Sequence, residues 1–233
     1  MTTIWTAGEV LIDLIPRERG NKPDLVRDPV VGGGPANTAK ALARLGFDSY
    51  FLCGLSDDAY GDQECAEFLA DNVKLDLSPI LHRPSATAEV TLDENGGATY
   101  VFTFQGTATF SELDNWLPDP SNPPAVLHVG TLGTLIEPSA SILYEWAQKV
   151  DAPIVYDPNI RPSVESNRDV YRANVIKWAA LASVVKLSDD DATCYFQDRK
   201  LKILPSYFLL WVFALSPSLL ENMALFLTPH TVL

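Results

Sequence analysis

The sequence predicts an α/β fold in which a central, mainly parallel sheet is covered by helices, with a small additional β-sheet that stands off the main domain. Three observations lead to this prediction: apolar strands alternate with helices, a glycine triplet opens one helix, and one hairpin interrupts the alternation. Apolar, β-branched strands are typical of sheets that are covered on both faces, and parallel strands need crossovers that are usually helical.

The alternation of strands and helices runs through most of the chain. The expected strands cover residues 4–7, 10–15, 50–53, 126–129, 154–156 and 184–187, and the expected helices cover 35–45, 62–72, 139–150 and 169–181. Parallel sheets bind ligands at the carboxyl ends of their strands. Asp13 stands past one such end, and Asp157, Asn159 and Arg161 stand past another, so these residues are candidates for a binding site.

The hairpin signal lies in residues 86–105. Two alternating segments, 86–92 and 98–104, flank the sequence Asp-Glu-Asn-Gly-Gly, whose residues tolerate the positive φ of tight turns. This hairpin predicts a small β-sheet that stands off the main domain, with an alternation that is not perfectly in phase across the pair. A plain surface hairpin is the alternative.

Residues 32–39 read Gly-Gly-Gly-Pro-Ala-Asn-Thr-Ala. Glycines let a backbone approach a ligand closely, and Pro35 suits the first turn of a helix, whose N-terminal amides then face the ligand. Gly33, Asn37 and Asp13 together offer donors and acceptors that suit the hydroxyls of a neutral polyol. A tight turn that merely enters a helix is the alternative. A dinucleotide fingerprint fits less well, because Asn37 stands where that motif needs glycine.

Composition limits the classes of partner. The chain has 233 residues, 47% of them hydrophobic, and a formal net charge of −13, which argues against binding to a nucleic-acid backbone. A nucleotide can still bind through helix N-termini and Mg²⁺. The three cysteines, Cys53, Cys65 and Cys194, form no CxxC pair, and no secretory signal opens the chain. We therefore expect a cytoplasmic protein with reduced thiols.

Four segments carry a family resemblance: residues 8–13 (GEVLID), 32–39, 41–61 (through ALARLG to GLSDDAYG) and 157–162 (DPNIRP). On these motifs, from about residue 4 to 191, the chain resembles the PfkB-type carbohydrate kinases, which include ribokinase, fructokinase and 2-keto-3-deoxygluconate kinase. The resemblance implies a ribokinase-like three-layer sandwich and ATP- and Mg²⁺-dependent phosphorylation of a sugar hydroxyl. It also implies that Asp13, Gly33 and Asn37 bind the sugar. Family members with an Asp-x-Asn-x-Arg pattern favour fructose or 2-keto-3-deoxygluconate, and ribose and nucleosides also fit these residues.

The resemblance implies further roles for residues in the second half of the chain. Arg161 would contact the sugar, its carboxylate or the transferred phosphoryl group, although a weak surface pair with Asp157 would also explain an arginine there. A network around phosphate and Mg²⁺ would include Asn159, Lys186, Ser188 and Asp191. The family commonly has Asn-x-x-Glu where Ser188 and Asp191 stand, and capping of a following helix is the alternative for these residues. No direct metal ligand is expected. The family has a β lid over its sugar site, which here would be formed by about residues 15–31 and 86–105. Phe102 would then be a candidate to cover the sugar, with Phe104 and Gln105 beside it, and the lid implies a homodimer.

The resemblance stops near residue 191, where the composition also changes. Residues 203–233 contain one charged residue, Glu221, and their apolar run 204–215 is shorter than a membrane span requires. The last glycine is Gly133, so the family's Gly-Ala-Gly-Asp segment, with its anion hole and catalytic base, is absent from the printed sequence. We therefore expect a partial kinase domain at 1–191, incomplete at its C-terminus through truncation or a frame shift, and an apolar tail at 192–233. A non-catalytic sugar-binding remnant, or an unstable fragment, is the alternative to an active kinase.

Overall fold

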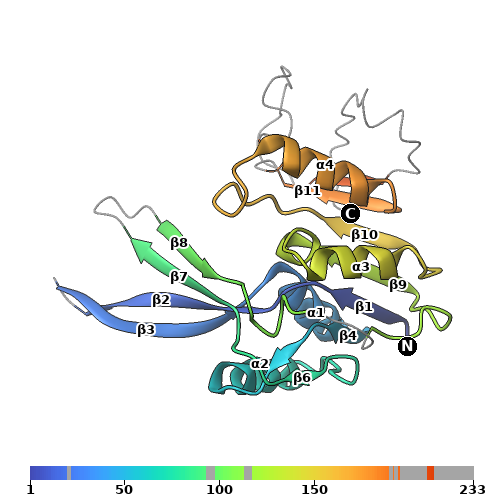
Figure 1. The fold of residues 1–233 in the computed structure, drawn as a ribbon. Coiled ribbons are helices and arrows are strands. Elements are labelled where there is room, and N and C mark those ends of the chain that lie inside the picture. Colours follow the sequence, from blue (N-terminus) through green and yellow to red (C-terminus); the bar gives the residue numbers. More distant parts are fainter. Residues whose placement is uncertain are drawn as a thin grey trace, which may run out of the picture. The chain divides into compact units, whose positions relative to one another are not determined.

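The computed structural model describes residues 1–19, 22–92, 98–112, 117–188, 191, 194 and 209–212. The chain divides into two units, Met1–Ala152 and Pro153–Leu233, and each is described by itself. Figure 1 shows the elements of both units in the order of the sequence.

The first unit combines parallel strands, helices and a separate antiparallel extension. Its strands are β1 (Thr3–Ala7), β2 (Leu11–Arg19), β3 (Lys22–Gly32), β4 (Asp48–Leu52), β5 (Leu55–Ser56), β6 (Ile80–Leu81), β7 (Thr87–Leu92), β8 (Ala98–Thr103) and β9 (Val126–Gly130). Its helices are α1 (Gly34–Arg44), α2 (Ala59–Ala70), the 3₁₀ helix η1 (Thr131–Thr134) and α3 (Ser139–Ala147).

Helices cover both faces of the parallel strands β4, β1 and β9. β1 lies between β4 and β9 and pairs in parallel with both. On one face, the Ser49 hydroxyl of β4 donates to the Ala39 carbonyl oxygen of α1 at 3.0 Å. On the other face, the Trp5 ring of β1 stacks on the Trp146 ring of α3, with 6.1 Å between the ring centroids. This layered arrangement confirms the predicted α/β class.

The helix boundaries follow from local capping. Gly33 is the N-cap of α1 and Pro35 lies in the first turn, as the sequence predicts. α2 begins three residues before the predicted start, because the Asp58 carboxylate accepts hydrogen bonds from the amides of Tyr60 (3.0 Å) and Gly61 (2.9 Å). A carboxylate in this position satisfies amides that have no partner within the helix.

Four strands form a second sheet, in the order β3, β2, β7, β8, which projects from the rest of the first unit (Figure 1). The predicted hairpin is confirmed as the antiparallel pair of β7 and β8. The expected phase mismatch is wrong, since Thr87 lies opposite Thr103 and Ala88 opposite Phe102. Five residues separate Leu92 from Ala98. Because this number is odd, odd-numbered residues of β7 pair with odd-numbered residues of β8, and even-numbered residues pair with even-numbered ones.

The second unit contains one parallel β-α-β crossover. β10 (Ile154–Asp157) and β11 (Val184–Leu187) pair in parallel and are joined through α4 (Arg168–Ala179). The ring of Tyr156 stacks on that of Trp178, with centroids 5.9 Å apart, which packs α4 on β10. β12 (Leu209–Val212) pairs antiparallel with β11 and is the part of the predicted tail that the structure describes as an element. The remainder of that tail, apart from Cys194, lies outside the described residues.

Neither unit has, in its described residues, a helix long and apolar enough to cross a membrane. The expected strands and helices between residues 4 and 187 are all present, with boundaries that differ by a few residues. The short elements β5, β6 and η1 were not predicted. Each is two to four residues long, which is too short for a periodic pattern to appear in the sequence.

Candidate functional site

Asp13 lies in β2, on the face of the projecting sheet opposite the apolar core. Its neighbours Ile12 and Leu14 belong to or pack against the core that includes Phe51 and Phe68, so Asp13 points the other way. The carboxylate is half-buried, and burial raises the pKa of Asp13 above its ordinary value. Within the described part of the chain it accepts no hydrogen bond, so its oxygens are free to accept from a ligand.

Gly33 and Asn37 lie where the chain enters α1. Gly33 has a φ of +108°, and a Cβ atom at this position would stand 2.6 Å from the carbonyl oxygen of Glu9. Only glycine fits here, whether or not a ligand is present. Asn37 is exposed in the first turn of α1, and its side-chain amide contacts no hydrogen-bond partner among the described residues. That amide can therefore donate to one ligand hydroxyl and accept from another.

Strand pairing brings Phe102 to the same sheet face as Asp13. Asp13 pairs with Ala88 across β2 and β7, and Ala88 pairs with Phe102 across β7 and β8. Paired residues point to the same face, and two strand spacings separate Asp13 from Phe102 by about 10 Å. The small Ala88 side chain lies between them, so a carboxylate and an aromatic ring face the same side of the sheet.

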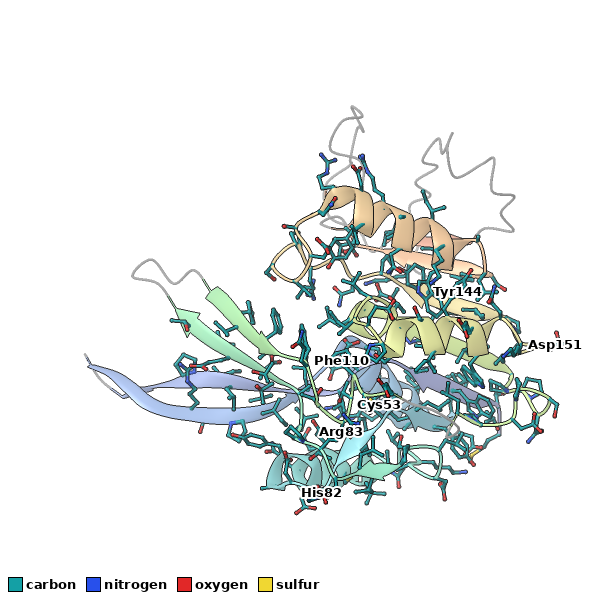
Figure 2. All side chains as sticks on the ribbon, viewed as in Figure 1. Cys53, His82, Arg83, Phe110, Tyr144 and Asp151 are labelled. Atoms are coloured by element: carbon teal, nitrogen blue, oxygen red, sulfur yellow. The ribbon has the colours of Figure 1, made fainter. Side chains whose placement is uncertain are left out.

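Phe102 belongs to a row of stacked rings. Its centroid lies 5.9 Å from that of Tyr100 and 5.0 Å from that of Phe104. Phe104 in turn meets Phe110 edge to face at 4.9 Å, and Figure 2 shows Phe110 near the base of the β7–β8 hairpin. The row fixes the orientation of Phe102 and gives this sheet face an apolar, aromatic surface.

Glu9 is a structural residue of the site that sequence reasoning did not single out. Its side chain is fully buried, and its carboxylate accepts hydrogen bonds from the amides of Gly34 (3.2 Å) and Gly133 (2.8 Å) and from the Thr131 hydroxyl. Burial raises the pKa of Glu9 to about 7, although these hydrogen bonds lower it in part. The available signal was one charged residue between Gly8 and Val10 in an otherwise apolar segment.

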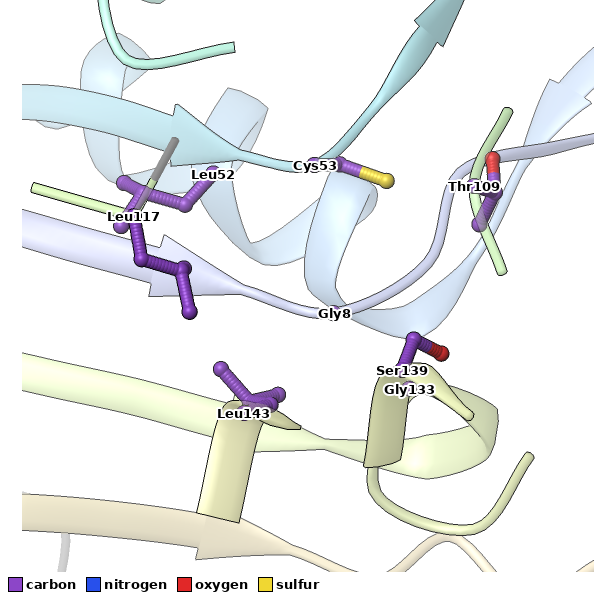
Figure 3. Close-up of a pocket in the computed structure, with 8 residues that line it drawn as sticks. All are labelled: Gly8, Leu52, Cys53, Thr109, Leu117, Gly133, Ser139 and Leu143. Atoms are coloured by element: carbon purple, nitrogen blue, oxygen red, sulfur yellow. The ribbon is translucent and has the colours of Figure 1, made fainter. Parts of the chain in front are cut away.

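A small pocket lies beside Gly8 and Gly133 (Figure 3). Leucine side chains and small residues line it: Leu52, Cys53, Thr109, Leu117, Ser139 and Leu143, together with the two glycines. Burial raises the pKa of the Cys53 thiol to about 12, so the thiol stays neutral. None of the predicted sugar-binding residues lines this pocket, and its apolar wall does not suit a polyol.

In the second unit, the loop after β10 carries Asn159 and Arg161. Asn159 has a φ of +40°, which turns the chain sharply after the strand. Tyr171 of α4 holds the Arg161 backbone from both sides, since its hydroxyl donates to the Arg161 carbonyl oxygen (2.7 Å) and accepts from the Arg161 amide (2.9 Å). The Arg161 guanidinium donates to the Ile160 carbonyl oxygen at 3.4 Å. The predicted alternative, a pair with Asp157, is not formed among the described contacts.

Asp157 pairs instead with Lys186, whose ammonium group lies 3.0 Å from Asp157 Oδ2. Asp191 is buried, and both of its carboxylate oxygens are occupied: Oδ1 accepts from the Ile160 amide at 2.5 Å, and Oδ2 accepts from the Ser188 amide (2.9 Å) and hydroxyl (2.7 Å). The Ser188 hydroxyl also accepts from the Asp191 amide at 3.1 Å, so these two residues exchange hydrogen bonds as in a capping box, the alternative that the sequence left open. The bond from Ile160 instead reaches the loop after β10. No group of three or more His, Cys, Asp or Glu residues that could hold a metal is found in the described residues.

Comparison with known proteins places these motifs in a family. The model of the pfkB family carbohydrate kinases matches residues 1–200. The chain belongs to this family. A fructokinase from Rhizobium leguminosarum bv. trifolii is 36% identical over 195 residues, which cover 81% of this chain and 58% of that protein. This member of the pfkB family thus spans less than two thirds of that relative's length.

Solved structures support the same assignment. The fructokinase of Xylella fastidiosa with bound ATP matches with a TM-score of 0.74 and 25% identity, over 84% of this chain and 64% of that one. The fructokinase of Vibrio cholerae in its fructose-, ADP- and calcium-bound form matches with a TM-score of 0.66 and 25% identity, over 84% and 63% of the two chains. The predicted pfkB membership and kinase fold are therefore confirmed.

Proposed function

We propose that the first unit of this chain binds a ketose of the fructose type through Asp13, Gly33 and Asn37. The observation that carries the proposal is that the Asp13 carboxylate and the Asn37 amide, on either side of the glycine segment 32–34, both lack a hydrogen-bond partner among the described residues. A half-buried carboxylate without a partner loses hydration, and a sugar hydroxyl would restore the lost hydrogen bond. The fructose-bound relative supports fructose as the first sugar to test.

Each group has a distinct role in this proposal. The Asp13 carboxylate accepts from sugar hydroxyls, the Asn37 amide both donates and accepts, and the Gly33 backbone allows the sugar to approach closely. Phe102 lies on the same sheet face as Asp13 and would cover the sugar with an apolar surface. An analogue that lacks a hydroxyl would leave Asp13 or Asn37 without a partner, so the site would discriminate against it.

The reaction of the family, in this proposal, is transfer of the terminal phosphoryl group of ATP to a sugar hydroxyl. Arg161, in the loop that Tyr171 holds, and Asn159 would contact the sugar or the phosphoryl group, and Lys186 would contribute positive charge. The ATP-bound relative supports ATP as the donor. The occupied oxygens of Asp191 do not fit a metal ligand, so we place Mg²⁺ on the nucleotide phosphates rather than on this carboxylate.

Phosphoryl transfer depends on positioned donors that stabilise the transferred group and on a base for the attacking hydroxyl. The printed sequence has no glycine after Gly133, so it contains no Gly-Ala-Gly-Asp segment. We therefore propose that this chain binds sugar but turns it over very slowly or not at all. This is the non-catalytic alternative that the sequence left open, and the absence of that segment favours it.

We also propose that a second copy of the chain covers the sheet face that carries Asp13. Three large apolar side chains on this face are about 40% exposed: Ile15 (40%), Tyr100 (43%) and Val30 (44%). Association of two such faces would remove them from water. Sedimentation velocity should detect a dimer, and Tyr100→Lys should shift it toward monomer. A wild-type chain that stays monomeric at high concentration would contradict this part of the proposal.

The experiment that tests sugar binding is calorimetric titration with fructose. We expect Asp13→Asn and Asn37→Ala each to weaken binding at least tenfold, because each removes a hydrogen-bonding group that faces the ligand. Asp151→Asn is the matched control, since Asp151 is exposed in the same unit and should not affect affinity. Equal affinity in all variants, or no binding by the wild type, would refute the proposed site.

A coupled assay of ADP release tests the catalytic part. We expect no fructose-dependent release by the wild type above that of Asp13→Asn. Turnover well above this background would show that the chain supplies its own base.

A further inference from the structure

Glu9 connects three backbone segments that lie far apart in the sequence. Its Oε1 accepts from the Gly34 amide, 25 residues away, and from the Thr131 hydroxyl, and its Oε2 accepts from the Gly133 amide, 124 residues away. The side chain is only 2% exposed. One buried carboxylate thus satisfies groups from the entry to α1 and from the turn after β9.

The three segments pack closely against one another. A Cβ atom on Gly8 would stand 2.4 Å from Pro35 Cγ, and one on Gly33 would stand 2.6 Å from the Glu9 carbonyl oxygen. A Cβ atom on Gly133 would stand 2.5 Å from the Gly8 Cα atom. Such close packing leaves no room for another side chain to bridge these segments, so the Glu9 carboxylate determines how the Gly34 and Gly133 amides are held.

The Gly34 amide belongs to the first turn of α1, which also carries Asn37. The Gly33 carbonyl oxygen accepts from the backbone N–H group of Asn37 at 3.0 Å, and the Gly34 carbonyl oxygen accepts from the Thr38 hydroxyl at 3.0 Å. Asn37 therefore follows any movement of Gly33 and Gly34. A shift at Glu9 would be transmitted to the Asn37 amide through one helical turn.

We propose that Glu9 is a positioning residue for the sugar site: its carboxylate fixes the start of α1 against the turn of Thr131 and Gly133 and so sets the place of Gly33 and Asn37. This inference rests on the proposed function for its ligand. The positioning itself is measurable without sugar.

Holding the Gly34 and Gly133 amides requires the two acceptor oxygens of a carboxylate, and a side chain of the same shape does not replace them. Both oxygens of an ionised carboxylate accept hydrogen bonds, whereas a glutamine side chain offers one acceptor and one donor group. In Glu9→Gln the NH₂ group would face either the Gly34 amide or the Gly133 amide, depending on its orientation. One buried backbone N–H group would lose its acceptor in either case.

Few titratable groups act near Glu9. Cys53 of β4 is coupled to Glu9 but stays neutral, because its pKa is raised to about 12. Glu64 of α2 acts on the same thiol, and burial raises the pKa of Glu64 to about 8. The hydrogen-bond donors to Glu9, which are Gly34, Thr131 and Gly133, do not titrate. A pH change between 5 and 9 therefore acts on the hydrogen bonds of the Glu9 carboxylate through the ionisation of Glu9 itself. Glu64 is the nearby carboxyl whose ionisation a control variant has to remove.

The experiment is NMR of the full chain labelled with ¹⁵N-glycine, which limits the spectrum to its 13 glycines. We expect the Gly34 and Gly133 amide shifts to titrate together with one midpoint, because both amides donate to one carboxyl. Glu64→Gln, which removes a second buried carboxyl of the same unit, should keep this common titration. Glu9→Gln should abolish it and should weaken fructose binding at least tenfold, whereas Glu64→Gln should leave fructose affinity unchanged.

Each outcome decides the proposal. Independent titration of Gly34 and Gly133, or a common titration with unchanged fructose affinity in Glu9→Gln, overturns it. If Glu9→Gln does not fold, the wild-type protein decides. Fructose affinity that changes with pH at the midpoint of the Gly34 and Gly133 amide shifts supports the proposal. Fructose affinity that does not change there overturns it. If the wild type binds no fructose, the proposed function fails, and the shared midpoint alone supports or overturns the positioning of α1.

Discussion

The Asp13 carboxylate lies directly against the backbone of Gly32. A Cβ atom built on Gly32 would stand 2.4 Å from Asp13 Oδ2, which is too close for any real contact. The two residues lie on neighbouring antiparallel strands, β2 and β3, where Asp13 is paired with Val30 and Gly32 is the diagonal neighbour. The missing side chain of Gly32 therefore leaves the space in which the Asp13 carboxylate stands.

Gly32→Ala should displace this carboxylate. Since the clash involves the end of a rotatable side chain, Asp13 can turn away, and we expect a stability loss of about 1 kcal/mol or less. Fructose affinity should fall at least tenfold, because the Asp13 oxygens no longer face the sugar. Calorimetric titration and thermal melting of the same variant separate the two effects.

Gly46→Ala is the control for Gly32→Ala. Gly46 has a φ of +88° and open space where a Cβ would stand, so this variant should lose about 1 kcal/mol of stability and keep its affinity for fructose. If Gly32→Ala and Gly46→Ala bound fructose with similar affinity, Gly32 would not be needed to leave space for the Asp13 carboxylate.

Gly33→Ala should be far more destabilising. Its added Cβ would lie 2.6 Å from the Glu9 carbonyl oxygen, and backbone atoms cannot move aside as a side chain can. Its φ of +108° adds strain. We expect a loss of about 3 kcal/mol or more, measured by urea unfolding, whereas Gly106→Ala, at a φ of +73° in open space, should lose only about 1 kcal/mol. Equal losses would show that the contact with Glu9 does not matter.

Glu64→Gln should change the pH dependence of stability. Burial raises the pKa of Glu64 to about 8, and repulsion from Asp58 adds to it, whereas in the unfolded chain the ordinary value of 4.5 applies. Between pH 4.5 and 8 the folded chain holds the proton that the unfolded chain has lost, so the free energy of unfolding falls as pH rises. Glu64 Oε1 is also buried without a hydrogen-bond partner in the described part of the structure.

We therefore expect the free energy of unfolding of Glu64→Gln to match that of the wild type near pH 5 and to exceed it at pH 8.5 by on the order of 4 kcal/mol. Thermal melting at both pH values measures this difference. Part of the decline should persist in the variant, because Glu9, with a pKa of about 7, is unchanged. A constant difference between the two proteins at all pH values would refute the ionisation of Glu64 as its cause.

Tyr171→Phe should release the loop that carries Arg161. The Tyr171 hydroxyl makes two hydrogen bonds to the Arg161 backbone, so its removal leaves one amide and one carbonyl group without this partner. We expect a loss of about 1 to 3 kcal/mol and a weaker affinity for fructose of the same order as in Arg161→Ala. Tyr60→Phe is the control, because no described residue forms a hydrogen bond with the Tyr60 hydroxyl. An affinity equal to that of the wild type would argue against a sugar contact by Arg161.

Local patterns in the sequence were sufficient for most of the fold. The start of α1 was predicted at Pro35, one residue after its observed start at Gly34. The β7–β8 hairpin followed from the turn sequence between the two strands, and β11 was predicted with its observed bounds. These elements depend on capping, turn conformation and apolar periodicity, which act over a few residues. The sequence alone also determined the absence of glycine after Gly133, on which the expectation of a missing anion hole depends.

Only the tertiary structure decided what the polar residues contact. The role of Glu9 depends on Gly34, Thr131 and Gly133, and that of Asp191 depends on Ile160, 31 residues earlier. The alignment of Asp13 with Phe102 depends on the register of three strands, which is set by pairing and burial across the whole sheet. Hydrogen bonds between residues so far apart in the chain leave no periodic trace, because folding rather than local conformation brings the partners together.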